Sequence, residues 1–280
     1  MARRWLITGA TGRLGDYLAE ACRRDGPVTT TSRSGGDRPC DLIDPVATGM
    51  LLREVKPDVV VHAAGLTDVD ACERDPQAAF AANRDTAVNL AAHMPPSARL
   101  VFISTDQVYP DVPGPHGESD ADPVNVYGRS KLAGEQATLA LEGALVLRTN
   151  FFGPSRRPGR ESLSDHLSRA LAARAPVVLF GDILFSPLLM ATLADLVPEL
   201  VEKNATGVLN AGSREGLSKA AFGLAIARVK GLPIESARVG SSSELPHRAP
   251  RAHDLRLDVA HIEKTLGRRM PTLEEEIKKL

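Results

Sequence analysis

Short runs of apolar and β-branched residues alternate with longer stretches of mixed polarity through the first half of the chain. Residues 59–61 are three consecutive valines, a uniformly apolar pattern typical of a parallel strand that is buried on both faces. Each run is followed by a stretch long enough for a helix, and this alternation predicts an α/β fold with a doubly wound (Rossmann) parallel sheet. The predicted strands are residues 5–8, 28–31, 59–61, 99–103 and 145–147.

Helix start signals stand between these strands. Asp44-Pro45 and Asp75-Pro76 each place a capping carboxylate before a proline, which suits the first position of a helix. The predicted helices of the first half cover residues 16–24, 45–55, 75–93 and 127–142.

The alternation loosens after Asn150. We expect a dinucleotide-binding domain over residues 1–149, with segments of about 176–212 returning to it. Residues 150–175 and 213–280 are expected to form a smaller mixed α/β lobe. This lobe would bind the substrate over the strand ends, where open α/β sheets bind their ligands.

Composition and charge narrow the class of protein. The 280 residues are 43% apolar and 25% charged, which is ordinary for a globular protein, and the formal net charge is -1. This charge gives no reason to expect nucleic acid or an anionic membrane as a partner. The three cysteines show no metal-ligand spacing and suit a reducing compartment. No apolar run approaches the ~20 residues that span a bilayer. We therefore expect a cytoplasmic protein without a metal site.

Three glycines follow the first predicted strand. Gly9, Gly12 and Gly15 stand between that strand and the first predicted helix. Strand, glycine turn and helix are the context of a dinucleotide-binding fingerprint, in which the backbone approaches a pyrophosphate at the positive end of the helix. The spacing of three and three differs from the commoner two and three, and a tight connection without a ligand is the alternative.

The end of the second predicted strand bears on the choice of cofactor. An NAD site usually carries an acidic residue there, to bind the ribose 2′-hydroxyl. This chain instead has Ser32-Arg33-Ser34. A guanidinium between two hydroxyls suits a 2′-phosphate, so NADP(H) is the preferred cofactor and NAD(H) a second candidate. An exposed loop arginine is the alternative reading of Arg33.

Tyr127 and Lys131 stand four residues apart in a predicted helix and so face the same side of it. A nearby ammonium lowers the pKa of a phenol from its reference of about 10. Such a tyrosine can exchange a proton near neutral pH. Thr105, at the end of a predicted strand, can offer a hydroxyl to the same substrate oxygen. A pair of this spacing is by itself most often a solvated surface pair.

Other candidate residues have two readings. Arg156, Arg157 and Arg160 fall in a loop that contains proline and glycine, and they either are solvated or face a substrate diphosphate. His62 ends a predicted strand and is interpreted as a packed residue rather than a catalyst.

Together these segments resemble an extended short-chain dehydrogenase/reductase, most closely the dTDP-4-dehydrorhamnose reductase group of NDP-sugar reductases. The resemblance extends over essentially the whole chain. Its motifs are Thr8-Gly9-Ala-Thr-Gly12-Arg-Leu-Gly15, the run 62–70, Asn83, the run 104–109, Tyr127-Gly-Arg-Ser-Lys131 within 125–135, and Leu147-Arg-Thr-Asn150. Phe151 departs from the family's usual tryptophan and Gln107 from its frequent aromatic residue, so both bear on the shape of the substrate.

The resemblance implies a catalytic triad of Thr105, Tyr127 and Lys131. Tyr127 would protonate the carbonyl oxygen as hydride arrives from the nicotinamide, which Lys131 would help to hold. The implied cofactor-binding residues are Gly9, Thr11, Gly12, Arg13, Leu14, Gly15, Ser32, Arg33, Asp41, Leu42, Ala63, Ala64, Gly65, Thr67, Asn83, Tyr127 and Lys131. The implied substrate-binding residues are Val69, Thr105, Asp106, Gln107, Asn150, Phe151 and Arg251.

The implied function is NAD(P)H-dependent reduction of a nucleotide-linked 4-keto-6-deoxy sugar by a monomer or homodimer. NDP-sugar dehydratases of the same superfamily carry Asp-Glu after the catalytic threonine, whereas this chain has Asp106-Gln107. An amide cannot take a proton from carbon, so a reductase is favoured over a dehydratase, and an epimerase stays open. The regulatory subunit of methionine adenosyltransferase, which resembles this family and binds NADP, gives a non-catalytic alternative.

Overall fold

A seven-stranded sheet forms the centre of the computed structural model, which describes residues 2–245 and 248–280. All neighbouring strands run parallel except β3, which is antiparallel to β2. The doubly wound parallel sheet predicted from the sequence is confirmed. In spatial order the strands are β11 (Gly207–Ala211), β6 (Leu145–Thr149), β5 (Arg99–Ile103), β4 (Val59–His62), β1 (Trp5–Thr8), β2 (Val28–Ser32) and β3 (Gly35–Gly36).

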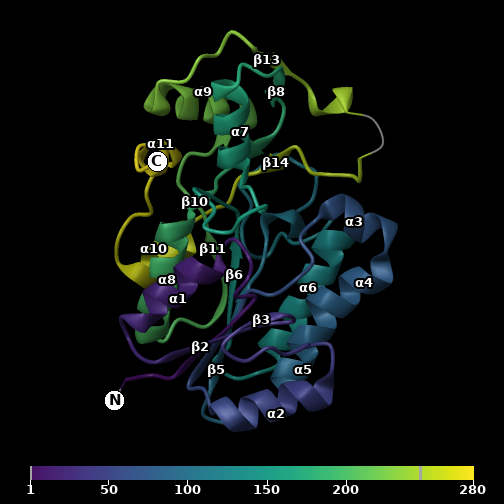
Figure 1. The fold of residues 1–280 in the computed structure, drawn as a ribbon, viewed down its shortest axis with the longest axis vertical. Coiled ribbons are helices and arrows are strands. Elements are labelled where there is room, and N and C mark those ends of the chain that lie inside the picture. The colour runs from purple at the N-terminus through teal and green to yellow at the C-terminus, as the bar shows by residue number, and fades with distance from the viewer. Residues whose placement is uncertain (1, 246–247) are drawn as a thin grey trace.

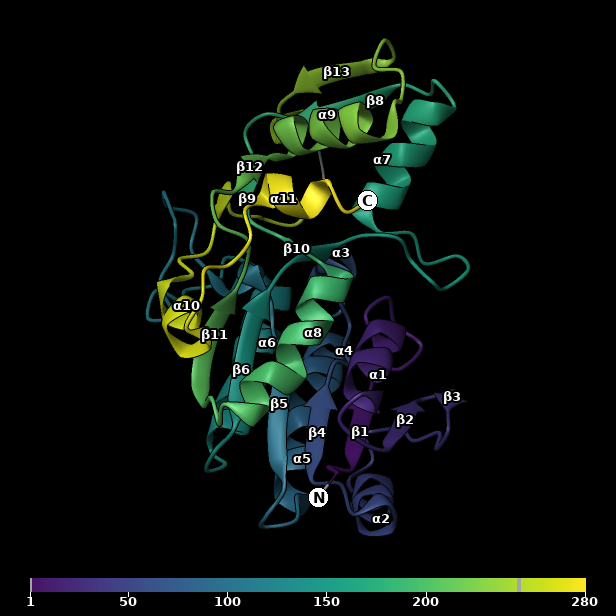
Figure 2. The ribbon, with the colours of Figure 1, turned by 90° about the vertical axis from the view of Figure 1, so that its left-hand side faces the viewer.

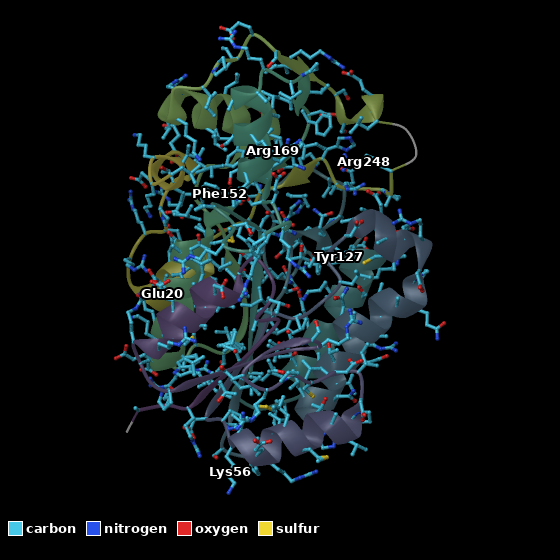
Figure 3. All side chains as sticks on the ribbon, viewed as in Figure 1. Glu20, Lys56, Tyr127, Phe152, Arg169 and Arg248 are labelled. Carbon is cyan, nitrogen blue, oxygen red and sulfur yellow. The ribbon has the colours of Figure 1, made fainter. Side chains whose placement is uncertain are left out.

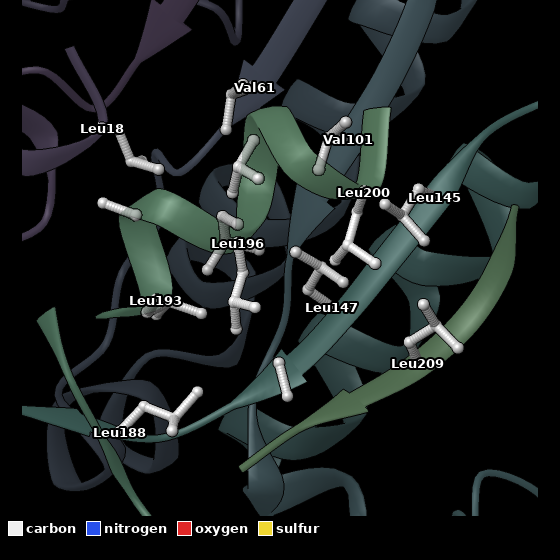
Figure 4. Packing of buried hydrophobic residues seen from close by; sticks show 14 of the residues in the cluster. Leu18, Val61, Val101, Leu145, Leu147, Leu188, Leu193, Leu196, Leu200 and Leu209 are labelled. Carbon is white, nitrogen blue, oxygen red and sulfur yellow. The ribbon is translucent and has the colours of Figure 1, made fainter. Parts of the chain in front are cut away.

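Helices cover both faces of this sheet (Figure 1). On one face, α1 (Gly15–Arg23) packs beside α8 (Met190–Glu202). Figure 4 shows Leu193, Leu196 and Leu200 of α8 over the leucines of β6. The other face is covered by α2 (Pro45–Val55), α5 (Thr86–His93) and α6 (Val126–Leu139). Because both faces are buried, the central strands are almost wholly apolar.

The helix predicted over residues 75–93 is divided in the structure. It consists of α4 (Pro76–Phe80), a π-helical turn over Ala81–Asp85 and α5. Before it lies α3 (Val69–Arg74). The wider turn contains Asn83, whose buried side chain bonds the backbone of Leu66 and the hydroxyl of Ser130. A π-turn in an otherwise α-helical stretch is often found beside a functional site.

A second lobe stands over the carboxyl ends of the strands (Figure 2). Phe152, Phe185 and Phe222 pack edge to face in its core. Its strands form short sheets, β13 with β8, β12 with β9 and β14, and β10 with β7. The elements not yet bounded are β7 (Phe151–Phe152), α7 (Leu163–Ala172), β8 (Val177–Phe180), β9 (Leu184–Phe185), β10 (Leu188–Leu189), β12 (Leu217–Ser218), α9 (Lys219–Lys230), β13 (Ala237–Gly240), β14 (Asp254–Leu255), α10 (Ala260–Leu266) and α11 (Leu273–Ile277), with 3-10 turns at Asp106–Val108 and Ser242–Glu244.

The chain passes between the two lobes more than once. β8 belongs to the upper lobe, whereas α8 packs on the large sheet and β11 is its edge strand. Near the end of the chain, α10 packs beside β11. The domain division at residues 149, 176 and 212 stays a prediction. Among the described residues, none of the helices has the length and apolar character needed to cross a membrane.

Candidate active site

A cavity of about 620 Å³ lies between the large sheet and the upper lobe. On the side of the sheet, its lining comes from the segments after β5 and β6. Arg13, after β1, and Thr67, after β4, also line it, and the strand order reverses between β1 and β4. Ligands of open α/β sheets bind at such a reversal. Tyr127 and Arg248 mark its two sides in Figure 3. The predicted substrate residues all line the cavity: Val69, Thr105, Asp106, Gln107, Asn150, Phe151 and Arg251.

The glycine turn after β1 is packed too tightly for side chains. A Cβ on Gly9, whose φ is +71°, would lie 2.6 Å from the carbonyl oxygen of Ala63. A Cβ on Gly15 would lie 2.5 Å from the carbonyl oxygen of Ala10. No side chain caps α1 at Leu14, so the first amides of this helix are left for another acceptor. This cradle fits the pyrophosphate of a dinucleotide.

The segment after β4 lies directly beside this turn. The Ala64 amide donates to the Thr8 hydroxyl at 3.2 Å, and a Cβ on Gly65 would lie 2.6 Å from Oδ1 of Asn83. Thr67 is exposed and lines the cavity. Asn83 is itself fully buried and bonded to protein groups, so it holds the backbone of this segment.

The predicted 2′-phosphate residues lie at the end of β2. Arg33 is exposed, and the hydroxyl of Ser32 donates to the carbonyl oxygen of Gly35. A Cβ on Gly35 would lie 3.0 Å from a methyl carbon of Thr11, so this end adjoins the glycine turn. Farther along, Asp41 is exposed and accepts from the Ile43 amide, and Leu42 is buried.

Tyr127 and Lys131 lie on one face of α6 and are 8% and 4% exposed. Asn125 caps the start of this helix, and its side chain accepts from the Gly128 amide at 2.8 Å. The Lys131 ammonium donates to the carbonyl oxygen of Ile103 at 2.7 Å and lies 4.0 Å from the ring centroid of Phe102. Burial lowers the pKa of Lys131 to about 7, and the charge of Glu135 opposes this shift.

The pKa of Tyr127 differs from the expectation of a phenol primed by Lys131. Burial raises the pKa of Tyr127, a hydrogen bond with Thr105 lowers it, and Asp106 raises it further. Arg13, which lines the cavity, is the cation that lowers it. Lys131 does not lower this pKa as expected, because its ammonium is directed to the carbonyl oxygen of Ile103 at the end of β5. Tyr127 therefore holds its proton and is suited to donate it.

Asp106 is buried beside this tyrosine, and burial raises the pKa of its carboxyl. It accepts from the Asn150 amide at 2.6 Å, from the Thr105 hydroxyl at 3.2 Å and from the Gln107 amide at 3.4 Å. Gln107 also accepts from Asn125. The position after Asp106 therefore carries a bonded amide where a dehydratase needs a carboxylate.

Several arginines bind protein groups instead of facing the cavity freely. Arg251 pairs with Asp70 of α3 through two nitrogens, and this bond lowers the pKa of Asp70 to about 2. Arg157 pairs with Asp16 and with the carbonyl oxygen of Ala10. Arg156 pairs with Glu20. The latter two tie the loop after β7 to α1, so the diphosphate reading of Arg156 and Arg157 is not supported.

His62 is packed, as its position suggested. Its ring nitrogens contact the hydroxyls of Thr8 at 2.7 Å and Thr86 at 3.1 Å, and burial lowers its pKa to about 3. Lys219, in contrast, lines the cavity and was not singled out in the sequence. It follows a helix-capping serine, a local pattern that carries no sign of a site.

The matches to known proteins extend over both lobes. A family model described as the RmlD substrate binding domain matches residues 3–280. The probable low-salt glycan biosynthesis reductase Agl14 of Haloferax volcanii is 30% identical over 97% of this chain and 95% of its own. The dTDP-4-dehydrorhamnose reductase of Mycobacterium tuberculosis is 33% identical over 90% of this chain and 83% of its own. The crystal structure of dTDP-4-dehydrorhamnose reductase from Bacillus anthracis in complex with NADP has a TM-score of 0.91 at 24% identity, covering 100% of this chain and 98% of that one.

Proposed function

The chain belongs to the RmlD family, the family of the dTDP-4-dehydrorhamnose reductases, and on this premise we propose that it uses NADP(H) to reduce a nucleotide-linked 4-keto-6-deoxy sugar. One observation carries the proposal. Thr105 and Tyr127 line a cavity that begins beside the glycine turn, and Lys131 is buried one helical turn from Tyr127.

The chemistry divides between cofactor and chain. When bound, the reduced nicotinamide supplies a hydride to the carbonyl carbon. The Tyr127 phenol donates its proton to the carbonyl oxygen, and the Thr105 hydroxyl holds that oxygen. Burial, which keeps Tyr127 protonated, serves this direction of the reaction. The Lys131 ammonium donates to the carbonyl oxygen of Ile103 at the end of β5. We propose that it would also hold the nicotinamide ribose when the cofactor is bound.

The side chains of Asp106 and Asn150 are suited to bind the sugar of the substrate. Their side chains are bonded to each other at the end of β5 and β6, so they offer hydrogen-bonding groups in a fixed position. Val69 and Phe151 supply apolar surface to the same cavity. Arg33 is proposed to bind the 2′-phosphate of NADP(H), and NAD(H) also fits the glycine turn.

Elimination is disfavoured at this site. Gln107 stands where a dehydratase has its carboxylate, and its amide is already bonded to Asp106 and Asn125. The non-catalytic alternative leaves the buried Tyr127 and Lys131 without a role. We further propose that the protein acts in the cytoplasm as a monomer or homodimer.

A steady-state assay tests the proposal. Purified protein is supplied with NADPH and a panel of dTDP- and UDP-linked 4-keto-6-deoxy sugars, and consumption of NADPH is followed. We expect turnover with at least one of these sugars. Binding of NADPH with no turnover of any keto sugar would overturn the reductase and favour the regulatory alternative.

A further inference from the structure

Lys219 is a cation in the cavity that the mechanism above does not use. It is the first residue of α9, and its backbone amide donates to the carbonyl oxygen of Ile183 at 2.9 Å. Its ammonium lies 5.9 Å from the ring centroid of Phe185. Within residues 2–245 and 248–280, no side chain or carbonyl forms a hydrogen bond or ion pair with this ammonium. Burial lowers its pKa, a cost that a bound anion would relieve.

The charges around Lys219 are unequally paired. Arg248 and Arg251 line the same cavity and both repel its positive charge. Arg251 is neutralised by Asp70, whereas Arg248 is exposed and has no ion-pair partner in the described part of the chain. Lys219 and Arg248 therefore present to one space two positive charges that have no ion-pair partner among the described residues.

The nearby carboxylates do not neutralise this pair. Asp106 attracts Lys219 from the side of the large sheet, but its oxygens are bonded to Asn150, Thr105 and Gln107. Asp182 is bonded by the hydroxyls of Ser241 and Ser242 and by the Ser242 amide. Both carboxylates contribute to the field at Lys219, and neither forms an ion pair with it.

We propose that Lys219, together with Arg248, binds the diphosphate of the nucleotide-sugar substrate and fixes the sugar between itself and Asp106. This proposal rests on the proposed function and adds a specific residue to it. A diphosphate that links a nucleoside to a sugar carries two negative charges, which match the two cations that lack ion-pair partners among the described residues. Charge-assisted bonds to phosphate are short and strong, and the burial of Lys219 strengthens them.

Binding of dTDP and UDP, compared with thymidine and uridine, tests this proposal without turnover. The variant is Lys219→Met, of similar length without the charge. The matched control is Lys230→Met, at the exposed end of the same helix. Isothermal titration in saturating NADP is expected to show diphosphate binding weakened by about 10- to 100-fold in Lys219→Met. Binding of the nucleosides and of NADPH, and all binding by Lys230→Met, should be unchanged.

The dependence on salt supplies a second readout. Loss of a charge contact should flatten the decline of diphosphate affinity with rising ionic strength, and Lys219→Arg should restore it. Unchanged diphosphate affinity in Lys219→Met, or equal weakening of diphosphates and nucleosides, would overturn the role of Lys219 and leave the reductase standing. If the wild-type protein binds neither diphosphate, the subsite and the nucleotide-linked substrate are both wrong.

Discussion

Arg148 and Glu135 form a wholly buried ion pair, with a guanidinium nitrogen 2.8 Å from a carboxylate oxygen. The same carboxylate accepts from the Ser104 hydroxyl, and the same guanidinium donates to the hydroxyl of Tyr109 at 3.1 Å. Residues 104 and 109 bracket the turn that carries Thr105, Asp106 and Gln107, so one ion pair holds both ends of this turn.

Removing the charge of Glu135 from this ion pair should destabilise the folded protein. Glu135→Gln leaves the Arg148 charge buried without its partner, and the free energy of unfolding should fall by about 3–5 kcal/mol. Urea unfolding followed by circular dichroism measures the change. Glu54→Gln, at an exposed pair with Arg38, is the control and should cost less than about 1 kcal/mol. Equal effects of the two substitutions would contradict the structural role of Glu135.

Tyr127→Phe should remove the proton donor and little else. We expect kcat to fall by about 10²- to 10⁴-fold, because the variant lacks the general acid, with NADPH affinity within about twofold of wild type. Tyr17→Phe is the control, since the Tyr17 hydroxyl bonds the carbonyl oxygen of Pro154 and lies outside the cavity lining. Retention of wild-type kcat by Tyr127→Phe would show that another group delivers the proton.

Arg33 should distinguish the two cofactors. Because its guanidinium is proposed to contact only the 2′-phosphate, Arg33→Ala should raise the KM for NADPH about tenfold or more and leave that for NADH unchanged. Arg38→Ala, which removes an exposed arginine paired with Glu54, serves for comparison. A parallel rise for both cofactors would assign Arg33 to some feature that they share.

The buried Lys131 should make stability depend on pH. Its pKa is lowered to about 7 in the folded protein, so the unfolded chain binds the extra proton between pH 7 and its ordinary value of 10.5. Folding is therefore penalised at pH 7 and the penalty is relieved as pH rises, by up to about 1.4 kcal/mol per pH unit. Unfolding of cofactor-free wild type and Lys131→Met at pH 7 and pH 9 measures this. Wild type should gain stability relative to the variant, and an unchanged difference would show that Lys131 stays charged.

Local patterns predicted the fold well. The uniform valines of β4 and the glycines after β1 could be interpreted from their near neighbours in the sequence alone. The observed sheet and the family match both agree with the fold that these patterns predicted. Tyr127 and Lys131 could be placed on one helical face by spacing alone. The individual roles of the site residues stay predictions until the substitutions above are made.

Other features depend on residues far apart in the chain. Arg251 meets Asp70, and Arg157 meets Asp16, across more than a hundred residues, so no local pattern could pair them. Lys219 looks like an ordinary helix start until the fold brings it to the cavity. The pKa of Tyr127 could not be predicted because burial, which outweighs the charges, is a property of the assembled core.

Asp70 also accepts a hydrogen bond from the backbone amide of Ala249. The segment that follows Arg248 is therefore bound to α3, which lies much earlier in the sequence. On the ribosome, Tyr127 and Lys131 emerge long before Ala249 and Arg251. A chain terminated before residue 249 would contain Thr105, Tyr127 and Lys131 but not the groups that bind Asp70, and it would also lack core residues such as Ile262 and Leu273. The lining of the cavity is thus completed only once residues 249–255 have been synthesised.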